Sequence, residues 1–174
     1  DVDAVTDRQL VQLSTANGTL YYFIRPTNGG AQALEFGNQN IADDQWHHVA
    51  FIRSGNTLNM YVDGALDQTS DLGFTTDITF PANALTSFNG KGGVDEMRIW
   101  NTSLDINVMR DYIYTNEIEN HPNLSELKGY YRFDDDAPST NVLDLAANNN
   151  ASLTLPGDWV ASGALSVPAN TVVS

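Results

Sequence analysis

The acidic residues best placed for catalysis stand side by side. Asp95 and Glu96 fall within 94–100, a run whose alternating pattern predicts a β-strand. Successive side chains of a strand point to opposite faces of the sheet, so these two carboxylates cannot act together as an acid–base pair. Glu96 is expected to pair with a neighbouring arginine.

The histidines are the next candidates, and the question is whether they could bind a metal ion together. His47 and His48 are adjacent in a predicted strand, and the third histidine, His121, stands far along the chain. Adjacent strand residues face opposite ways, whereas a metal site needs its ligands to converge. We therefore expect packed or hydrogen-bonded histidines here.

The densest acidic cluster runs from Asp134 to Asp136, with Asp144 a short distance beyond. One interpretation is a calcium-binding loop, but the spacing does not fit the D-x-[DN]-x-[DN]-G pattern of EF-hands. The alternative, which we favour, is a solvated turn after the predicted strand 127–133.

Exposed aromatic rings would matter for sugar binding, because they stack on the apolar faces of pyranoses. Most rings in strands should be buried, but two tyrosine pairs are consecutive, and one member of each must face away from its neighbour. The candidates for exposure are Tyr21 or Tyr22, and Tyr130 or Tyr131.

These residues are positioned by strands organised around the stretch WHHVAFIRSGNTLNMYVDG, residues 46–64. It predicts two strands, 46–53 and 57–62, and Asp63-Gly64 is a type I′ hairpin signal that leads into a third strand. Because both faces of 46–53 are largely apolar, we expect a central strand covered on both sides. The predicted core consists of Trp46, Ala50, Ile52, Leu58, Met60, Val62, Met97 and Ile99.

Shorter signals predict the remaining elements. The further strands expected are 9–14, 20–24, 33–36, 78–80, 94–100, 127–133 and 151–155, with 37–44 as a polar approach and 159–161 as a short apolar run. One helix is predicted by the apolar stripe Ile106, Met109 and Ile113. We expect Thr102 or Ser103 to cap it, and it should end between 116 and 120, before Pro122.

The block at 46–64, followed by GGVDEMRIWNTSL and by LKGYYRFDDDAPSTNVLDLAANNNASL, resembles the laminin G-like, concanavalin A-like jelly roll. The likeness is strongest to the bacterial laminin-G-like or pentraxin-like branch, and it covers roughly residues 8–165. It implies an all-β fold: a two-sheet antiparallel jelly-roll sandwich with one short helix.

The same resemblance predicts where the domain begins and ends. We expect one domain over 1–165 and a tail or linker over 166–174. The family's opening strand pair has no match here. Either the chain begins partway through a domain, or the segment after the helix fills the missing edge, since an open edge strand invites aggregation.

The resemblance also bears on chemistry. In related glucanases, an aspartate matching Asp95 helps hold a structural calcium ion, so Asp95 is implied as a Ca²⁺ ligand; the alternative is that it accepts hydrogen bonds from loop amides. Calcium takes six to eight oxygens, and one carboxylate would need carbonyls, water or another acid beside it. The catalytic E-x-D-x-x-E or E-x-D-x-E strand of the glucanases is missing, so we expect no catalytic residues and no enzyme.

The amino-acid composition excludes some classes of binding partner. The chain has 174 residues, 22 acidic against 8 basic, a net charge of −14 and no cysteine. Such a field repels phosphate backbones, so we expect no nucleic-acid partner, and no run is long enough for membrane insertion. We predict a non-catalytic extracellular or cell-surface module of a larger secreted bacterial protein, flanked by other domains. It would bind a glycan or a surface protein; the alternatives are a structural spacer in a long adhesin and, last, a glycoside hydrolase.

Overall fold

The computed structural model describes residues 8–13, 18–25, 33–75, 92–135, 140–152 and 164–165. Contacts within the chain group it into two compact units, residues 1–89 and 90–174. We describe each unit by itself. The predicted strand 78–80 and the apolar run 159–161 lie outside the described residues.

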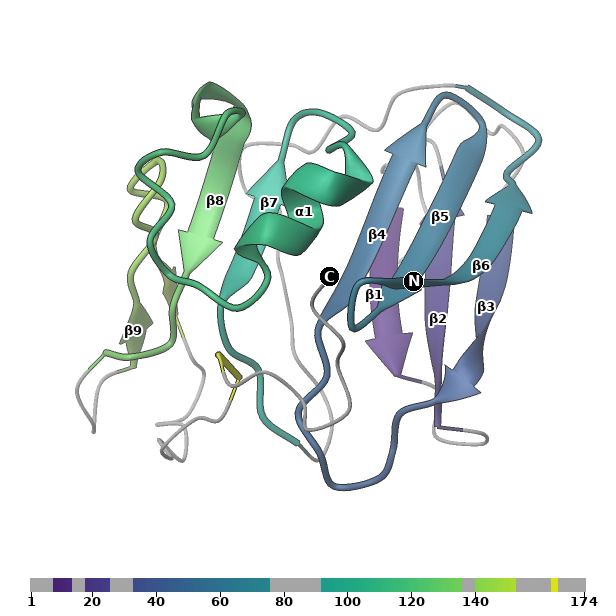
Figure 1. The fold of residues 1–174 in the computed structure, drawn as a ribbon, viewed down its shortest axis with the longest axis horizontal. Helices are drawn as coiled ribbons and strands as arrows, with labels where there is room; N and C mark the ends of the chain where they lie inside the picture. Colours follow the sequence, from purple (N-terminus) through teal and green to yellow (C-terminus); the bar gives the residue numbers. More distant parts are fainter. Residues whose placement is uncertain are drawn as a thin grey trace, which may run out of the picture. The chain divides into compact units, whose positions relative to one another are not determined.

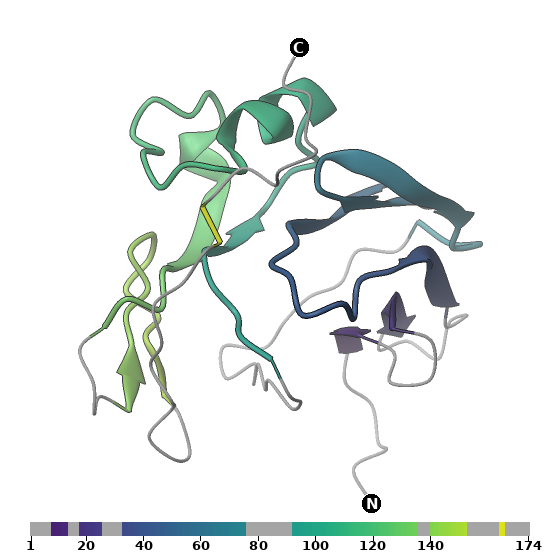
Figure 2. The same cartoon turned by 60° about the horizontal axis from the view of Figure 1, so that its bottom comes forward.

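The first unit contains two three-stranded antiparallel sheets (Figures 1 and 2). One sheet has the order β1-β2-β3, and the other has the order β4-β5-β6. The strands are β1 (Arg8–Leu13), β2 (Thr19–Arg25), β3 (Ala33–Asn40), β4 (Val49–Ser54), β5 (Thr57–Val62) and β6 (Ala65–Asp71).

The core of this unit lies between the two sheets, which is the arrangement of a β-sandwich. Tyr22 and Ile24 of β2 and Leu58 and Met60 of β5 are buried in one cluster, joined by the partly buried Phe51 of β4. The expected burial of Leu58, Met60 and Val62 is therefore confirmed.

The predicted role of β4 is wrong in two respects. Among the described strands, β4 pairs only with β5 and stands at the edge of its sheet. Its core-facing residue is also not the one we expected: Phe51 lies directly opposite the buried Met60, whereas Ile52 lies opposite Asn59. Opposed residues of antiparallel strands share a face, so Ala50 and Ile52 point away from the core.

Two other expected core residues, Trp46 and Ile99, are exposed. Trp46 precedes β4, which begins at Val49, so the strand's alternation does not govern it. Ile99 lies on a short strand of the second unit whose opposite face, with Arg98 and Trp100, makes the buried contacts described below.

The hairpin joining β5 to β6 forms as predicted. Asp63 and Gly64 have positive φ angles of 49° and 75°, the backbone that a type I′ turn requires. By contrast, the polar segment after Phe36 continues β3 to Asn40. The reason is a long-range contact: the Asp67 carboxylate accepts the backbone N–H groups of Asn38 at 2.9 Å and Gln39 at 2.9 Å. This joins β3 to β6.

The second unit contains short elements. These are β7 (Met97–Trp100), α1 (Ile106–Tyr112), the 3₁₀ turn η1 (Leu124–Glu126), β8 (Leu127–Tyr131), β9 (Asn141–Val142) and β10 (Ala151–Ser152). β7 pairs with β8 and β9 with β10, all antiparallel. The predicted strands 94–100 and 127–133 are thus shortened.

Helix α1 has the predicted stripe but different ends. Met109 and Ile113 are buried. Asp105 is the N-cap, because its carboxylate accepts the Asn107 N–H at 2.8 Å, so the expected caps at Thr102 and Ser103 are wrong. The helix ends at Tyr112, earlier than predicted. Within the described residues, no helix is long and apolar enough to cross a bilayer.

The sandwich core gives a stability test. Met60 is 0 % exposed and Leu66 is 56 % exposed, although both are aliphatic residues of the same sheet. Met60→Ala should lower the free energy of unfolding by about 2–5 kcal/mol, whereas Leu66→Ala should stay within about 0.5 kcal/mol of the parent. Urea unfolding measures both, and equal losses would contradict the proposed core.

Candidate functional site

The outer face of the β1-β2-β3 sheet carries aromatic and aliphatic side chains. Tyr21 of β2 lies directly opposite Phe36 of β3, and Phe23 lies opposite Leu34. The two pairs are two residues apart on each strand, so they stand on the same face. That face is opposite the one bearing Tyr22, because Tyr22 points into the core. We call Tyr21, Phe23, Leu34 and Phe36 the aromatic face.

The aromatic face is accessible in the structure. Leu34 is 48 % exposed and Phe36 is 49 % exposed, while Tyr21 and Phe23 are half-buried. The rings of Tyr21 and Phe36 stack with centroids 5.6 Å apart and planes 29° apart. None of the side chains that the structure describes hydrogen-bonds the Tyr21 hydroxyl. Contiguous exposed apolar surface of this kind commonly marks an interaction site.

Small residues on the inner face allow this arrangement. Ala33 and Gly37 are the buried positions of β3. A Cβ atom on Gly37 would lie 2.4 Å from Oδ2 of Asp67, so glycine is needed for the Asp67 carboxylate to reach the β3 backbone.

The expectation that one of Tyr21 and Tyr22 faces away from the core is confirmed, since Tyr22 is buried and Tyr21 is half-buried on the other face. The sequence prediction missed Leu34 and Phe36. Strand alternation alone would place the large apolar Leu34 and Phe36 inside. Their exposure follows from pairing, because Glu35 lies opposite the buried Tyr22 and Ala33 lies opposite the buried Ile24.

Asp95 and Glu96 do not lie on a strand, because β7 begins at Met97. Glu96 has a positive φ of 51°, and the Asp95 carboxylate accepts the Glu96 N–H at 2.9 Å. No three histidine or acidic side chains gather into a metal site in the described part of the chain. The role of Asp95 as a Ca²⁺ ligand stays a prediction, because one carboxylate needs further oxygen ligands beside it.

Glu96 belongs instead to a partly buried polar network in the second unit. Its carboxylate pairs with Arg98 at 3.0 Å and accepts the Tyr130 hydroxyl at 2.7 Å. The Arg98 guanidinium lies over the Tyr130 ring, 5.2 Å from its centroid. Burial, reinforced by the hydrogen bond to Glu96, raises the pKa of Tyr130 to about 12. The expected pairing of Glu96 with an arginine is confirmed.

Arg98 also holds the end of helix α1. Its guanidinium donates to the carbonyl of Tyr112 at 2.7 Å and to the carbonyl of Thr115. The last carbonyls of a helix have no partner within the helix, so a cation placed there satisfies them and complements the helix dipole. The network therefore attaches α1 to β7 and β8.

The histidines make the packed and hydrogen-bonded contacts expected of them. His47 lies between two carboxylates, with Nδ1 2.8 Å from Asp63 and Nε2 3.0 Å from Asp43. Burial lowers the pKa of His47, but the hydrogen bonds to these two carboxylates outweigh it and the net shift is upward. His121 is buried and stacks on Trp100 with ring centroids 4.3 Å apart. Burial, with help from the nearby Arg98 charge, lowers the pKa of His121.

The acidic residues of the cluster 134–136 and Asp144 make different contacts. Asp134 pairs with Arg132 at 2.7 Å, and Asp135 accepts the Leu143 N–H at 3.1 Å. Asp136 lies outside the described residues. Asp144 is 2 % exposed, so the expected solvated turn is wrong for this residue.

The Asp144 carboxylate accepts four backbone N–H groups instead. Their donors are Tyr130 at 2.9 Å, Ala146 at 2.9 Å, Asn149 at 3.1 Å and Ala147 at 3.3 Å. Burial by itself raises the pKa of Asp144, but these four hydrogen bonds lower it below the ordinary value. The contacts attach the turn 145–149 to β8.

The antiparallel sheets of the described residues agree with the sequence comparison. The family profile described as the concanavalin A-like lectin/glucanases superfamily matches residues 4–106. The chain belongs to this superfamily. A comparison with curated proteins finds no match.

Two solved structures resemble this superfamily member. One, from Bacteroides ovatus, is named a "putative carbohydrate binding protein"; it aligns with a TM-score of 0.56 and 16 % identity over 88 % of this chain and 50 % of that one. The other is an S-layer domain-containing protein from Clostridium thermocellum, with a TM-score of 0.31 and 16 % identity over 64 % of each chain. The first likeness supports the fold, and the second is too distant to support any argument. Our chain spans about half the length of the first structure.

The Asp144 contacts predict a pH-dependent effect. Asp144→Asn removes the charge and turns an amide NH₂ toward backbone donors, so it should lower the free energy of unfolding at pH 7 by about 1–3 kcal/mol. Because the folded pKa of Asp144 is depressed, its stabilisation is present above the unfolded pKa and is lost as pH falls through the folded one. The deficit of the variant should therefore shrink near pH 3.

Urea unfolding at both pH values is the measurement. Asp111→Asn is the matched control, since Asp111 is exposed. A deficit that is the same at both pH values, or one shared by the control, would rule out the carboxylate role.

Asp95 has a separate test with calcium. If it helps hold Ca²⁺ in the folded state alone, a hundredfold excess of calcium over the dissociation constant should stabilise the protein by about 2.7 kcal/mol. Asp95→Asn should abolish that gain. Thermal melts with calcium and with chelator measure it, and identical melting temperatures for the parent protein would remove the metal hypothesis.

Proposed function

We propose that this chain is a non-catalytic carbohydrate-binding module and that glycans bind on the aromatic face. The observation that carries the proposal is the stacked, accessible Tyr21–Phe36 pair on a sheet that turns its other side to the core. Flat aromatic surfaces suit the apolar faces of pyranose rings, and a tyrosine adds a hydroxyl at the edge of the contact.

Two further observations support a binding role. The superfamily is described as one of lectins and glucanases, and the similar Bacteroides ovatus structure is named a "putative carbohydrate binding protein". The sequence over 94–100 carries Asp95 and Glu96 as neighbours, without the alternate acids that a retaining glycosidase needs on one face. We further propose that the module belongs to a larger extracellular or surface-attached bacterial protein, next to other domains.

A glycan array covering plant, algal and host polysaccharides, followed by calorimetry on the best ligand, tests the proposal. Phe36→Ala should weaken binding by about tenfold or more, equivalent to about 1.4 kcal/mol. Phe36→Tyr should retain binding because it keeps a ring, whereas Phe36→Leu should lose it although it keeps apolar volume. Leu66→Ala is the matched control, since Leu66 is an exposed residue of the other sheet.

The outcomes separate the alternatives. Full binding by Phe36→Leu would indicate a generic apolar contact, such as a protein partner makes. Silence across the array, with calcium present, would overturn the proposal and favour a structural spacer. Equal losses in Phe36→Ala and Leu66→Ala would place the glycan elsewhere.

A further inference from the structure

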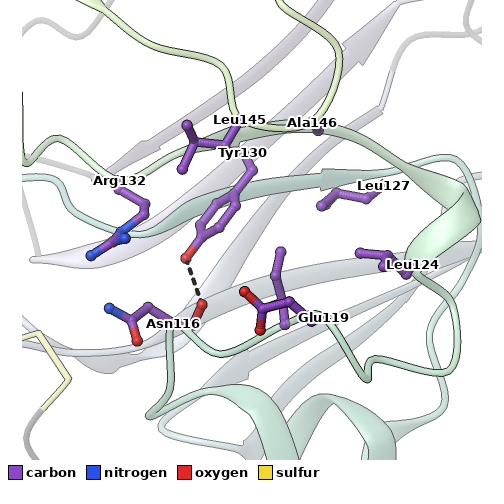
Figure 3. A pocket seen from close by; sticks show the side chains of 9 residues that line it. Asn116, Glu119, Leu124, Leu127, Tyr130, Arg132, Leu145 and Ala146 are labelled. Atoms are coloured by element: carbon purple, nitrogen blue, oxygen red, sulfur yellow. Dashed lines mark hydrogen bonds between the residues drawn. The ribbon is translucent and has the colours of Figure 1, made fainter.

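The second unit contains a hollow of about 380 Å³ (Figure 3). Three segments of the same unit form it: the loop 116–119 after α1, the stretch 124–132 comprising η1 and β8, and the turn at 145–146. Its volume is at the small end of the range for ligand pockets. The aromatic face lies in the other unit, so this site does not depend on the proposed glycan function.

One wall of the hollow is aliphatic. Leu124 and Leu145 line it and are exposed, while Leu127 and Ile118 beneath them are buried. In Figure 3 the leucines lie above and to the right of the hollow, and the Glu119 carboxylate lies at its lower rim. An apolar group placed here would remove both exposed leucines from water, which is favourable in proportion to the area buried.

The charges around the hollow leave one carboxylate unmatched. Arg98 pairs with Glu96 at 3.0 Å, and Arg132 pairs with Asp134 at 2.7 Å. Among the described residues, none forms a hydrogen bond or an ion pair with the Glu119 side chain. Two charged residues line the hollow, Arg132 and Glu119. Arg132 is paired with Asp134 and, at 3.5 Å, with Glu96, so among the described residues Glu119 is the lining residue whose charge has no partner.

The Tyr130 hydroxyl is already occupied. It donates to Glu96 at 2.7 Å and lies 3.5 Å from the carbonyl of Asn116, the contact drawn as a dashed line in Figure 3. Recognition in this hollow thus depends on the aliphatic wall and on the free carboxylate of Glu119.

We infer that this hollow binds a compact primary amine, with its aliphatic or aromatic body against Leu124 and Leu145 and its ammonium group at Glu119. The net charge of −14 on the chain also favours the approach of a cation. The amine is recognised by its charge together with its apolar body, so neither feature alone is sufficient for full affinity.

Hexylammonium is the probe, and hexanol, with the same body and no charge, is the comparison ligand. Binding to the full chain is followed by amide chemical shifts in NMR titrations. Hexylammonium should bind with a dissociation constant on the order of 1 mM, about two- to fivefold tighter than hexanol, as expected for one exposed ion pair. The shifts should map to 116–119, 124–132 and 145–146.

Three variants assign the contacts. Glu119→Gln should reduce hexylammonium affinity to that of hexanol and leave hexanol unchanged. Leu145→Ser should weaken both ligands. Glu117→Gln is the matched control, because Glu117 is an exposed carboxylate two residues away that does not line the hollow.

Four results would overturn the inference: no saturable shifts with either ligand, shifts that map elsewhere, hexanol binding as tightly as hexylammonium, or equal losses in Glu117→Gln and Glu119→Gln. The last would mean that the general negative field attracts the amine. None of these results bears on the aromatic face, so failure here and failure of the glycan proposal are distinguishable.

Discussion

Directly opposed residues of antiparallel strands share a face of their sheet, and in the described strands β2 to β5 this constraint decides which side chains are buried. Once Leu58 and Met60 enter the core, Phe51 must follow them, because Met60 pairs with Phe51. On the other sheet, the burial of Tyr22 forces its neighbour Tyr21 outward, opposite Phe36. The core and the aromatic face are thus two results of the same pairing register.

Hydrogen bonds from polar side chains to the backbone hold elements together where strand pairing does not. In the first unit, the Asp67 carboxylate fixes β3 to β6 through two backbone N–H groups. In the second unit, Arg98 satisfies carbonyls at the end of α1 and Asp144 satisfies four amides around β8. These side chains meet backbone groups that would otherwise be left unsatisfied, and such groups are costly when buried. The Asp144 contacts also hold the turn that contributes Leu145 and Ala146 to the hollow at Glu119.

Local signals were enough to predict much of the fold. Strand β5 was predicted at its observed bounds, and the Asp63-Gly64 turn followed from the two residues that best tolerate a positive φ. The superfamily could also be recognised from the sequence. The face of β4 that points to the core could not be predicted from the sequence. Ala50, Phe51 and Ile52 are all apolar, and only their pairing with β5 distinguishes them.

The contacts of Asp144 and Glu96 were harder to predict, because the local sequence does not determine them either. Three of the four amides around Asp144 belong to residues two to five positions after it. The fourth belongs to Tyr130 and requires the turn 145–149 to fold against β8, which no local pattern indicates. Likewise, Glu96 lies just before β7 rather than within it, because its φ angle is positive, a conformation that glutamate seldom adopts. Strand alternation could not predict either arrangement, and the exposure of Phe36 likewise depends on its pairing with Tyr21.

The most direct measurement is an NMR titration of the full chain with the best glycan from the array, following both amide and aromatic side-chain signals. Our account predicts that the largest changes occur at Tyr21, Phe23, Leu34 and Phe36, with little change around Glu119 in the second unit. Changes centred on any other surface, with the aromatic rings of β2 and β3 unaffected, would contradict it.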